Sequence, residues 1–497
     1  MVVVTAATKR SAWAPSWSLG LGLLVFMVLV NAGGEGLLGD PDTQWHIAIG
    51  TWILEHGRVP TVDGHSFTFL GKPWIAKEWL SQIALALAFE AGGWGGVVVL
   101  AAAAIAATFA LLLRLLLRDL APLPALVLAS AAAAMSAPQF LARPHVLALP
   151  FALLWVAGLV QAVEQRRAPR PVLLLAMLMW ANLHGGFTLG LLLCAVFAFE
   201  GLFGARGAAE RKLLFSAWLK FTVAAAAVGC LTPYGPESML VTFRIFNLGT
   251  VLSAIQEWSS PDFHEQFVQE GVLLLGLFAA LSFGLKLPFV RLVVVLGLLH
   301  LYLKYARNGE LLATLAPLML APVLARQWPV LAPDEGSTRV MAVGHPAGRW
   351  AVAVVLLGAA IFGLGIARYG ALKPPVEAMP AAAIAFVRSA KLEGPVFNDY
   401  DFGGALIQAG IPTFIDGRAE LYGGDFIKHY VEALGLRGDE SLEQVLDRHA
   451  IQWTFLRKDR PANRLLEHLP GWRRAYGDDV ATIFVRERAL ARPNKSD

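Results

Sequence analysis

The sequence predicts an α-helical polytopic membrane protein with an additional α/β domain at its C-terminus. Of the 497 residues, 56% are hydrophobic and 16% are charged, whereas a soluble domain carries about 25% charged residues. The charges are also unevenly distributed, because residues 369–497 hold 35 of the 78 charged side chains. This composition excludes an ordinary soluble enzyme. It divides the chain into a membrane domain, 1–368, and a C-terminal domain, 369–497.

The membrane domain contains enough apolar sequence for about eleven spans, because one span needs about 20 predominantly apolar residues. Several of the segments are short, so the number of spans depends on how they are divided. The segments lie at 17–38, 95–117, 121–137, 146–163, 170–182, 186–204, 213–231, 268–285, 288–305, 310–325 and 350–368.

Basic residues between these segments predict the orientation of the chain, because Lys and Arg gather in cytoplasmic loops. An odd number of spans then places the C-terminal domain outside the cytoplasm, together with the long first loop, 39–94. Polar groups at the ends of apolar helices are costly unless they face a cavity or one another. We therefore expect the working site in an external cavity. The basic residues on the cytoplasmic side are Lys9, Arg10, Arg114, Arg118, Arg166, Arg167, Arg170, Arg206, Arg211, Lys212, Lys286, Arg291, Arg326 and Arg349.

The first external loop opens with a helix whose start and end are marked in the sequence. Asp40 suits the N-cap position, Pro41 the first helical position and Gly57 the C-terminal cap. Capping alone would therefore explain the presence of Asp40.

Other polar residues of this loop each allow two interpretations. Asp42 and His46 share one face of the helix, and Asp42 is either a site carboxylate or an acid that complements the helix dipole. Glu78 is either a second acid in the cavity or the first-turn acid of the next helix. Asp63 and His65 lie in a turn, where hydrogen bonds to the Asp side chain are the simpler explanation.

The first loop contains a recognisable pattern. An acidic residue follows the first span directly, aromatic rings come next, and a Gly and a Pro follow them. The pattern consists of Asp42, Trp45, His46, Gly57 and Pro60. It resembles the first loop of the GT-C superfamily of membrane glycosyltransferases, which includes protein mannosyltransferases, aminoarabinose transferases and oligosaccharyltransferases. Thr43 departs from the pattern, because many members have Glu at that position.

Longer stretches resemble a group of bacterial membrane proteins assigned to the same superfamily. These stretches are DPDTQWHIAIGTWILEHGRVP, VDGHSFTF, GKPWIAKEWL and NLHGGF. The resemblance implies transfer of a sugar from a polyprenyl-phosphate carrier to a glycan, lipid or protein acceptor. It places this reaction at the outer face of a bacterial cytoplasmic membrane, among the membrane lipids. Nothing in the basic clusters indicates binding of nucleic acid.

Such a transfer needs a carboxylate that takes or steers the acceptor's proton and cations that stabilise the leaving phosphate. We assign the carboxylate to Asp42, with Asp40 as its helper or alternative. The two also match the D-x-D form of other members, which can hold a divalent cation through oxygen ligands. Because some members need such an ion and others do not, we assign no metal ligand.

Several residues of the outward loops are candidates for binding substrate. Arg143 can neutralise a lipid phosphate or extend to the lipid headgroups, and Arg307 departs from the positive-inside trend, which indicates an anionic partner. Asn182 and His184 flank a diglycine, and a tight turn alone can explain that motif. The candidates are His46, Glu78, Arg143, His145, Asn182, His184, Arg307 and Asn308.

The C-terminal domain alternates short apolar stretches with helical ones, which predicts a small α/β domain. The predicted strands are 396–398, 413–416, 453–457 and 482–485. Polar runs at 397–404 and 416–424 lie at strand ends, where α/β sheets bind ligands. Acceptor recognition is one interpretation of these runs, and turn geometry with an ion pair of Arg418 is the other.

Two other functions are compatible with this composition. A transporter or flippase also gathers polar groups in a cavity, but the sequence shows no repeat symmetry of the kind that transporters have. A non-catalytic scaffold for polymer assembly would bind through the C-terminal domain alone. Dependence of activity on Asp42 would separate the glycosyltransferase from both.

Overall fold

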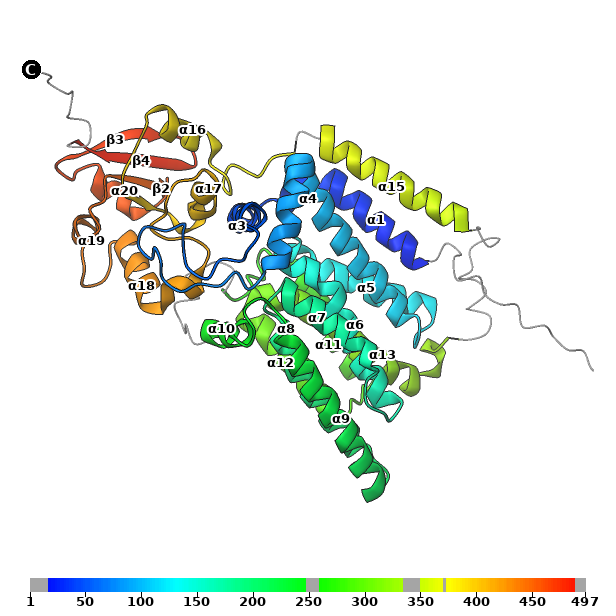
Figure 1. Ribbon diagram of the computed structural model, residues 1–497. Helices are drawn as coiled ribbons and strands as arrows, with labels where there is room; N and C mark the ends of the chain where they lie inside the picture. Colours follow the sequence, from blue (N-terminus) through cyan, green and yellow to red (C-terminus); the bar gives the residue numbers. More distant parts are fainter. Residues whose placement is uncertain (1–16, 247–258, 334–348, 370–371, 488–497) are drawn as a thin grey trace, which may run out of the picture.

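A computed structural model describes residues 17–246, 259–333, 349–369 and 372–487. Long helices form a bundle, and a small α/β domain built from the C-terminal residues lies at one end of it (Figure 1). Lys9 and Arg10, the first basic pair of the sequence, lie outside the described residues.

A helix occupies each of the eleven apolar segments that the sequence singles out. By length and composition, four helices of the described residues suit a membrane crossing: α4, α6, α9 and the helix that ends with α13. The number of eleven spans therefore stays a prediction. The helices of the bundle are α1 (Trp17–Ala32), α4 (Trp79–Leu116), α5 (Pro122–Ser136), α6 (Pro144–Glu164), α7 (Leu174–Leu183), α8 (Phe187–Phe203), α9 (Ala208–Gly229), α11 (Phe267–Ser282), α12 (Phe289–Lys304), α13 (Gly309–Gln327) and α15 (Arg349–Tyr369).

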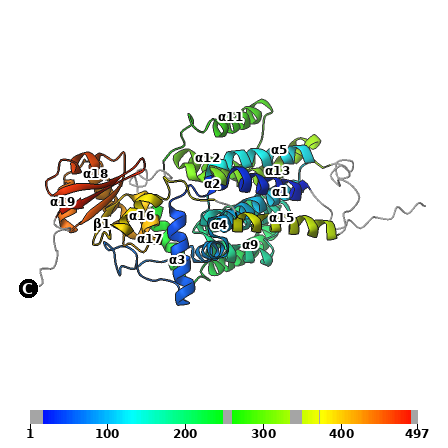
Figure 2. The same ribbon diagram turned by 90° about the horizontal axis from the view of Figure 1, so that it is seen from above.

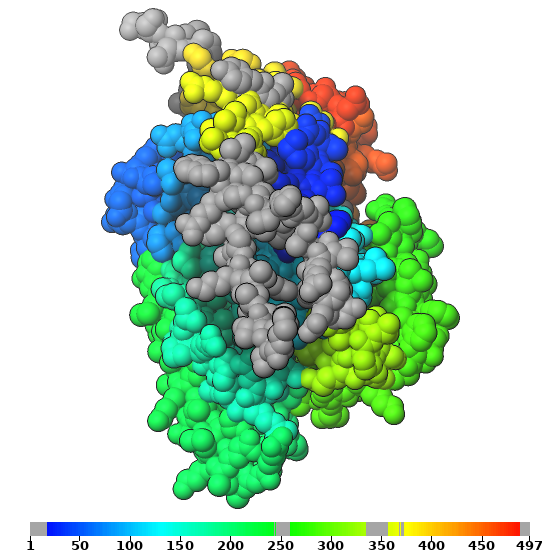
Figure 3. Space-filling view, turned by 90° about the vertical axis from the view of Figure 1, so that its right-hand side faces the viewer, coloured from blue at the N-terminus to red at the C-terminus, as the bar shows by residue number. Residues whose placement is uncertain are grey.

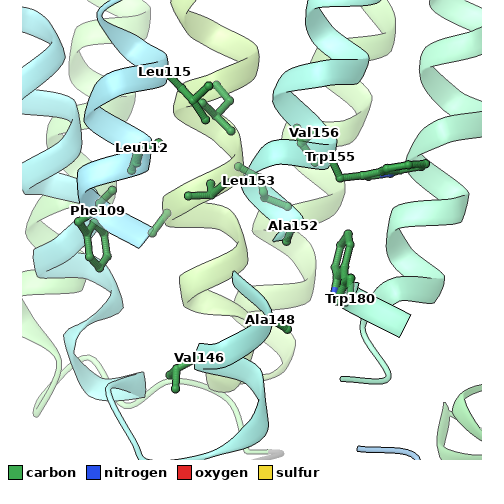
Figure 4. Close-up of a cluster of buried hydrophobic side chains, with 14 of the residues drawn as sticks. Phe109, Leu112, Leu115, Val146, Ala148, Ala152, Leu153, Trp155, Val156 and Trp180 are labelled. Atoms are coloured by element: carbon green, nitrogen blue, oxygen red, sulfur yellow. The ribbon is translucent and has the colours of Figure 1, made fainter. Parts of the chain in front are cut away.

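The core of the bundle lies where α4 packs against α6 (Figure 4). Phe109 and Leu112 of α4 and Leu153 of α6 are fully buried there. The indole N–H of Trp155 donates to the backbone oxygen of Gly190 at 2.8 Å, so this polar group inside the core is paired. Because lipid tails are as apolar as these side chains, close van der Waals packing holds the helices together.

Two short helices connect α1 to the first loop, α2 (Gly34–Leu37) and α3 (Asp42–His56). Helix α3 begins one residue later than the sequence predicts, with Pro41 at the N-cap. The Asp40 carboxylate accepts a hydrogen bond from the backbone N–H of Asp42 at 2.7 Å, which holds Asp40 outside the first turn. Gly57 ends the helix in the left-handed conformation, φ 61°, as predicted.

The first part of α4 lies against α3 before the helix enters the bundle. A kink at Gly92 and Gly93 separates the two parts of α4. The backbones of α3 and α4 come so close that a β-carbon on Gly50 would lie 2.0 Å from the carbonyl oxygen of Gln82. This close packing places the beginning of α3 next to the beginning of α4.

The C-terminal domain is the α/β domain that the sequence predicts. Its four-stranded sheet has the order β1-β2-β4-β3, in which β1 is parallel to β2 and the other neighbours are antiparallel. The strands are β1 (Val396–Asn398), β2 (Trp453–Arg457), β3 (Trp472–Gly477) and β4 (Ala481–Arg486). The helices are α16 (Ala381–Ser389), α17 (Gly403–Gln408), α18 (Ala419–Leu434), α19 (Leu442–Arg448) and α20 (Pro461–Leu466).

The predicted strand at 413–416 is wrong. Thr413 forms only an isolated parallel bridge with Ser66 of the first loop. Its N–H donates to the carbonyl oxygen of His65, and its carbonyl accepts from Phe67, both at 3.0 Å. The backbone of this segment therefore pairs with the first loop instead of with the sheet, and it ties the C-terminal domain to that loop.

Two hollows lie at the end of the bundle away from the C-terminal domain (Figures 1 and 2). Arg166, Arg291 and Arg326 line a hollow of about 710 Å³, and Arg118 lines another of about 320 Å³. Figure 3 looks toward this end, with the orange and red atoms of the C-terminal domain visible only at the upper edge. Which side of a membrane this end faces stays a prediction.

Candidate active site

The two acids of the D-x-D motif share one arginine. Nη1 of Arg143 lies 2.9 Å from a carboxylate oxygen of Asp40, and Nη2 donates to a carboxylate oxygen of Asp42. Arg143 comes from the loop directly before α6, where the following Pro144 favours an extended backbone, and its φ and ψ are −124° and 162°. Pairing compensates the cost of burying these charges, which are at most 13% exposed. The structure thus brings three predicted site residues together.

Glu78 lies between two histidines of the predicted set. Its carboxylate oxygens are 3.8 Å from Nε2 of His46 and 3.5 Å from Nε2 of His184. Glu78 precedes α4 directly, and its side chain makes no capping hydrogen bond to that helix. Glu78 therefore does not cap α4 through its side chain, and its role as a second acid of the site stays a prediction.

Burial sets the charge of this second cluster. It lowers the pKa of His46 and of His184 well below the ordinary value, with nearby cations acting in the same direction. The backbone N–H of Gly186 donates to Nδ1 of His184 at 3.1 Å, so the neutral ring carries its proton on Nε2, facing Glu78. Burial also raises the pKa of Glu78, a shift that the ammonium of Lys77 opposes.

A small cavity of about 60 Å³ lies beside these clusters. The predicted residues Arg143, His145, His184, Arg307 and Asn308 all line it. Polar residues from three separate outward segments therefore meet at one place, and their binding of substrate stays a prediction.

Glu310 lines the same cavity and was missed at the level of sequence. Its side chain is 6% exposed, and one carboxylate oxygen lies 3.6 Å from Nε2 of His145. That oxygen has no hydrogen-bond partner among the residues that the structure describes. The signal was present, because Glu310 follows Arg307 and Asn308 at the start of an apolar helix. A first-turn acid is, however, also what the helix dipole favours.

Asn182 lies next to this site with its amide group already engaged. Its Oδ1 accepts a hydrogen bond from the indole N–H of Trp79 at 2.9 Å. Its Nδ2 donates to the carbonyl oxygens of Leu178 and Leu231 at 2.8 and 3.1 Å. Asn182 thereby positions Trp79, the neighbour of Glu78, and direct binding of substrate by Asn182 stays a prediction.

Asp63 forms the turn that the sequence indicates. It also has a partner, Arg418, that the sequence did not predict. The Asp63 carboxylate accepts from the backbone N–H groups of His65 and Ser66 at 3.0 and 3.1 Å. In addition, Nη1 of Arg418 donates to Asp63 at 2.6 Å, while the same guanidinium binds Asp416 at 2.7 Å. All three charged side chains are fully buried. For the run 416–424, the geometry therefore favours the ion pair of Arg418.

Within the part of the chain that the structure describes, no group of three or more His, Cys, Asp or Glu side chains is arranged to hold a metal ion. The carboxylates of Asp40 and Asp42, the pair that could form such a site, are bound to Arg143.

No family model matches the chain, and no curated protein matches it. Solved structures do match. The archaeal oligosaccharyltransferase AglB from Archaeoglobus fulgidus, in complex with an inhibitory peptide and a dolichol-phosphate, has a TM-score of 0.53 at 12% identity. The apo form of the oligosaccharyltransferase from the same organism has a TM-score of 0.50 at 9% identity. Both likenesses cover 89% of this chain and 69% of the other.

ArnT from Cupriavidus metallidurans, bound to undecaprenyl phosphate, covers 96% of this chain at 11% identity, with a TM-score of 0.39. The fold assignment rests on the two oligosaccharyltransferase structures. At their level of identity the likeness shows the fold alone: this chain has the fold of these archaeal oligosaccharyltransferase structures.

Proposed function

We propose that this chain is a membrane glycosyltransferase that moves a sugar from a polyprenyl-phosphate carrier to an acceptor at the outer face of a bacterial cytoplasmic membrane. The observation that carries this proposal is the buried D-x-D pair held by Arg143, beside a cavity that Arg307 also lines. A carboxylate next to cations is what sugar transfer from a phosphate carrier requires. The GT-C fold supports the same reaction class, since its neighbour AglB is an oligosaccharyltransferase solved with a dolichol-phosphate.

In the proposed mechanism, Arg143 connects donor binding to the availability of Asp42. A guanidinium binds phosphate with the same two-pronged geometry that it uses for carboxylate. A donor phosphate that reaches Arg143 therefore competes with Asp42 for that group. Once the phosphate is bound, the carboxylate of Asp42 is available to accept a proton.

The transfer step then involves one bond formed and one broken. The acceptor's nucleophilic atom attacks the anomeric carbon of the sugar, and its proton passes to Asp42. The bond from the anomeric carbon to the phosphate oxygen breaks, and polyprenyl phosphate leaves with the electron pair. Arg143 and Arg307 stabilise the charge that develops on the leaving phosphate.

The remaining predicted site residues are assigned to the sugar of the donor. Glu78 can accept hydrogen bonds from sugar hydroxyl groups, and the neutral rings of His46 and His184 can donate or accept them. His145 and Asn308 line the cavity together with Arg307. The cavity of about 60 Å³ is small compared with ligand pockets of about 300–1,000 Å³, so donor entry requires lining elements to move apart.

The proposal is tested by sugar release from radiolabelled polyprenyl-phosphate donors, with the purified full-length protein in detergent. We expect Asp42→Asn to lower turnover about 10²–10⁴-fold, the contribution of a general base, and Asp40→Asn to have a smaller effect. Asp262→Asn, in an exposed loop, is the matched control and should retain full turnover. Equal turnover in all four proteins would contradict the assignment of the first loop. Substrate uptake that is independent of Asp42 would favour a transporter.

A further inference from the structure

The C-terminal domain lies directly on α3, the helix that begins at Asp42. Helix α17 packs against α3 (Figures 1 and 2). A β-carbon on Gly404 would lie 2.3 Å from the carbonyl oxygen of Pro41, so the two backbones are in contact at the start of α3. The side-chain amide of Gln44 also donates to the carbonyl oxygen of Ala378 at 3.3 Å.

One residue of the domain touches the proposed catalytic carboxylate. A β-carbon on Gly417 would lie 1.9 Å from a carboxylate oxygen of Asp42 and 2.8 Å from the indole nitrogen of Trp45. Gly417 is held in place by its neighbours Asp416 and Arg418, whose side chains form the fully buried ion pair described above. The backbone at Gly417 is therefore a fixed wall beside Asp42, and only glycine fits there without moving either side.

A second contact reaches the residue beside Glu78. Nζ of Lys77 lies 2.9 Å from a carboxylate oxygen of Glu420, at the start of α18, and the two side chains are 14% and 8% exposed. Burial alone would lower the pKa of Lys77, but the carboxylates of Glu420 and Glu78 reverse that effect and raise it. The ammonium group therefore stays charged, bound to an acid of the C-terminal domain, and its charge also acts on the neighbouring Glu78.

We propose that the C-terminal domain completes the active site, with Gly417 positioning Asp42 directly and Glu420 positioning Glu78 through Lys77. This inference rests on the proposed function and assigns a role to a domain that would otherwise be only a binding module. By holding Lys77, Glu420 prevents its ammonium from pairing fully with Glu78, whose carboxylate then remains available to the sugar. Loss of Glu420 is expected to weaken donor binding, whereas displacement of Asp42 is expected to slow the transfer step.

The first test compares Glu420→Gln and Glu420→Asp with the wild-type full-length protein. Glu432→Gln is the matched control, because Glu432 lies on the same helix and pairs with Lys428 at 3.8 Å on the exposed surface. We expect Glu420→Gln to raise the KM for the donor about tenfold, with kcat nearly unchanged, the equivalent of one hydrogen bond to a charged group. Glu420→Asp should recover part of the loss, and Glu432→Gln should match the wild type. Unchanged kinetics in Glu420→Gln would overturn the role of Glu420.

The second test addresses the contact with Asp42. Gly417→Ala places a methyl group against the carboxylate, and we expect kcat to fall at least tenfold in the folded protein. Gly64→Ala is its control. Gly64 lies in the same first loop as Asp42, but a β-carbon at Gly64 meets no atom within 4 Å. If kcat falls only in proportion to the amount of folded protein that is lost, the positioning role of Gly417 is contradicted.

Hydrogen exchange at the start of α3 separates a failure of this inference from a failure of the proposed function. If the wild type releases no sugar from any donor, the proposed function fails, but the contact is still measurable. Amide exchange over residues 42–46 should be faster in Gly417→Ala and in Glu420→Gln than in the control variants Gly64→Ala and Glu432→Gln. Exchange equal to that of the two control variants would overturn the inference whatever the activity.

Discussion

An arginine bridges two carboxylates at each end of the bundle, and the two bridges differ in where their partners come from. Arg143 binds Asp40 and Asp42, which lie two residues apart in one loop. Arg291 of α12 binds Glu164 of α6 at 2.6 Å and Glu200 of α8 at 2.8 Å. The second bridge ties three helices together, whereas the first ties the start of α6 to one turn of chain.

The comparison shows that neither buried charge nor the size of a hollow identifies the site. The hollow beside Arg291 measures about 710 Å³, and the cavity beside Arg143 about 60 Å³. Nη1 of Arg291 also donates to the carbonyl oxygen of Met319 at 3.0 Å, so that each of its three polar nitrogens has a protein partner. The guanidinium of Arg291 thus connects three helices and a backbone carbonyl, and its role is to stabilise the fold. We therefore expect substitution of Arg291 to affect stability without a separate effect on activity, and substitution of Arg143 to affect activity beyond any loss of stability.

The largest effect is expected for Arg291→Gln. Removal of one partner from a buried ion pair costs about 3–5 kcal/mol of unfolding free energy, because the other charges stay buried without compensation. The measurement is thermal or denaturant unfolding of the purified protein in detergent, together with sugar release by the folded fraction. Arg244→Gln is the control, because Arg244 forms an exposed pair with Glu237 and exposed pairs contribute about 0–1 kcal/mol. If turnover per folded molecule falls as far in Arg291→Gln as in an active-site variant, Arg291 is not purely structural, and the distinction between the two bridges is wrong.

Arg143→Gln is expected to act mainly on catalysis. A single group that stabilises developing charge contributes about 10²–10³-fold in kcat, or about 2.7–4 kcal/mol, and we expect a loss in that range. Arg143→Lys keeps the charge without the two-pronged geometry, so it should recover only part of the turnover. Unfolding temperatures measured in parallel show whether Arg143 is a structural bridge of the Arg291 kind. Full turnover in Arg143→Gln would contradict the proposed role of Arg143 at the phosphate.

Sequence reasoning was most successful where one property decides the outcome. Each helix of the bundle could be placed because apolar length alone marks it, and Gly57 because a left-handed helix end favours glycine. The segment 413–416 looked like a strand because its side chains are apolar. Its partner is, however, the first loop, through the bridge from Thr413 to Ser66, and no local pattern shows which backbone a segment pairs with.

The site residues could be identified one by one, but not their pairing. Arg143 and His184 are conspicuous as polar residues at the ends of apolar helices, which is costly without a partner. Whether Arg143 reaches a lipid phosphate or Asp42 depends on how α6 packs against the first loop, and the sequence does not show that distance. Glu310 and Lys77 were missed for a related reason, since a first-turn acid and a loop lysine are common on any protein surface.

The smallest expected effect is a pH dependence confined to the end with the cavity. The folded protein lowers the pKa of His184 well below its ordinary value of 6.5, so the unfolded chain binds more protons than the folded one below about pH 6.5. The stability contributed by the neutral ring is fully present above that pH and is lost as the pH falls toward the lowered folded pKa. One histidine supplies a slope of about 1.4 kcal/mol per pH unit in this window.

The difference between the wild type and His184→Gln isolates that slope. The charged and titratable groups that face His184 are His145, Arg307, Lys77, Arg143 and Glu78, and all of them remain in the variant. Unfolding free energies measured from pH 7.5 downward should therefore fall less steeply in His184→Gln than in the wild type. No histidine takes part in the bridge of Arg291 to Glu164 and Glu200, so Arg291→Gln should leave the slope unchanged. An equal slope in His184→Gln and the wild type would show that His184 is not buried in its neutral form.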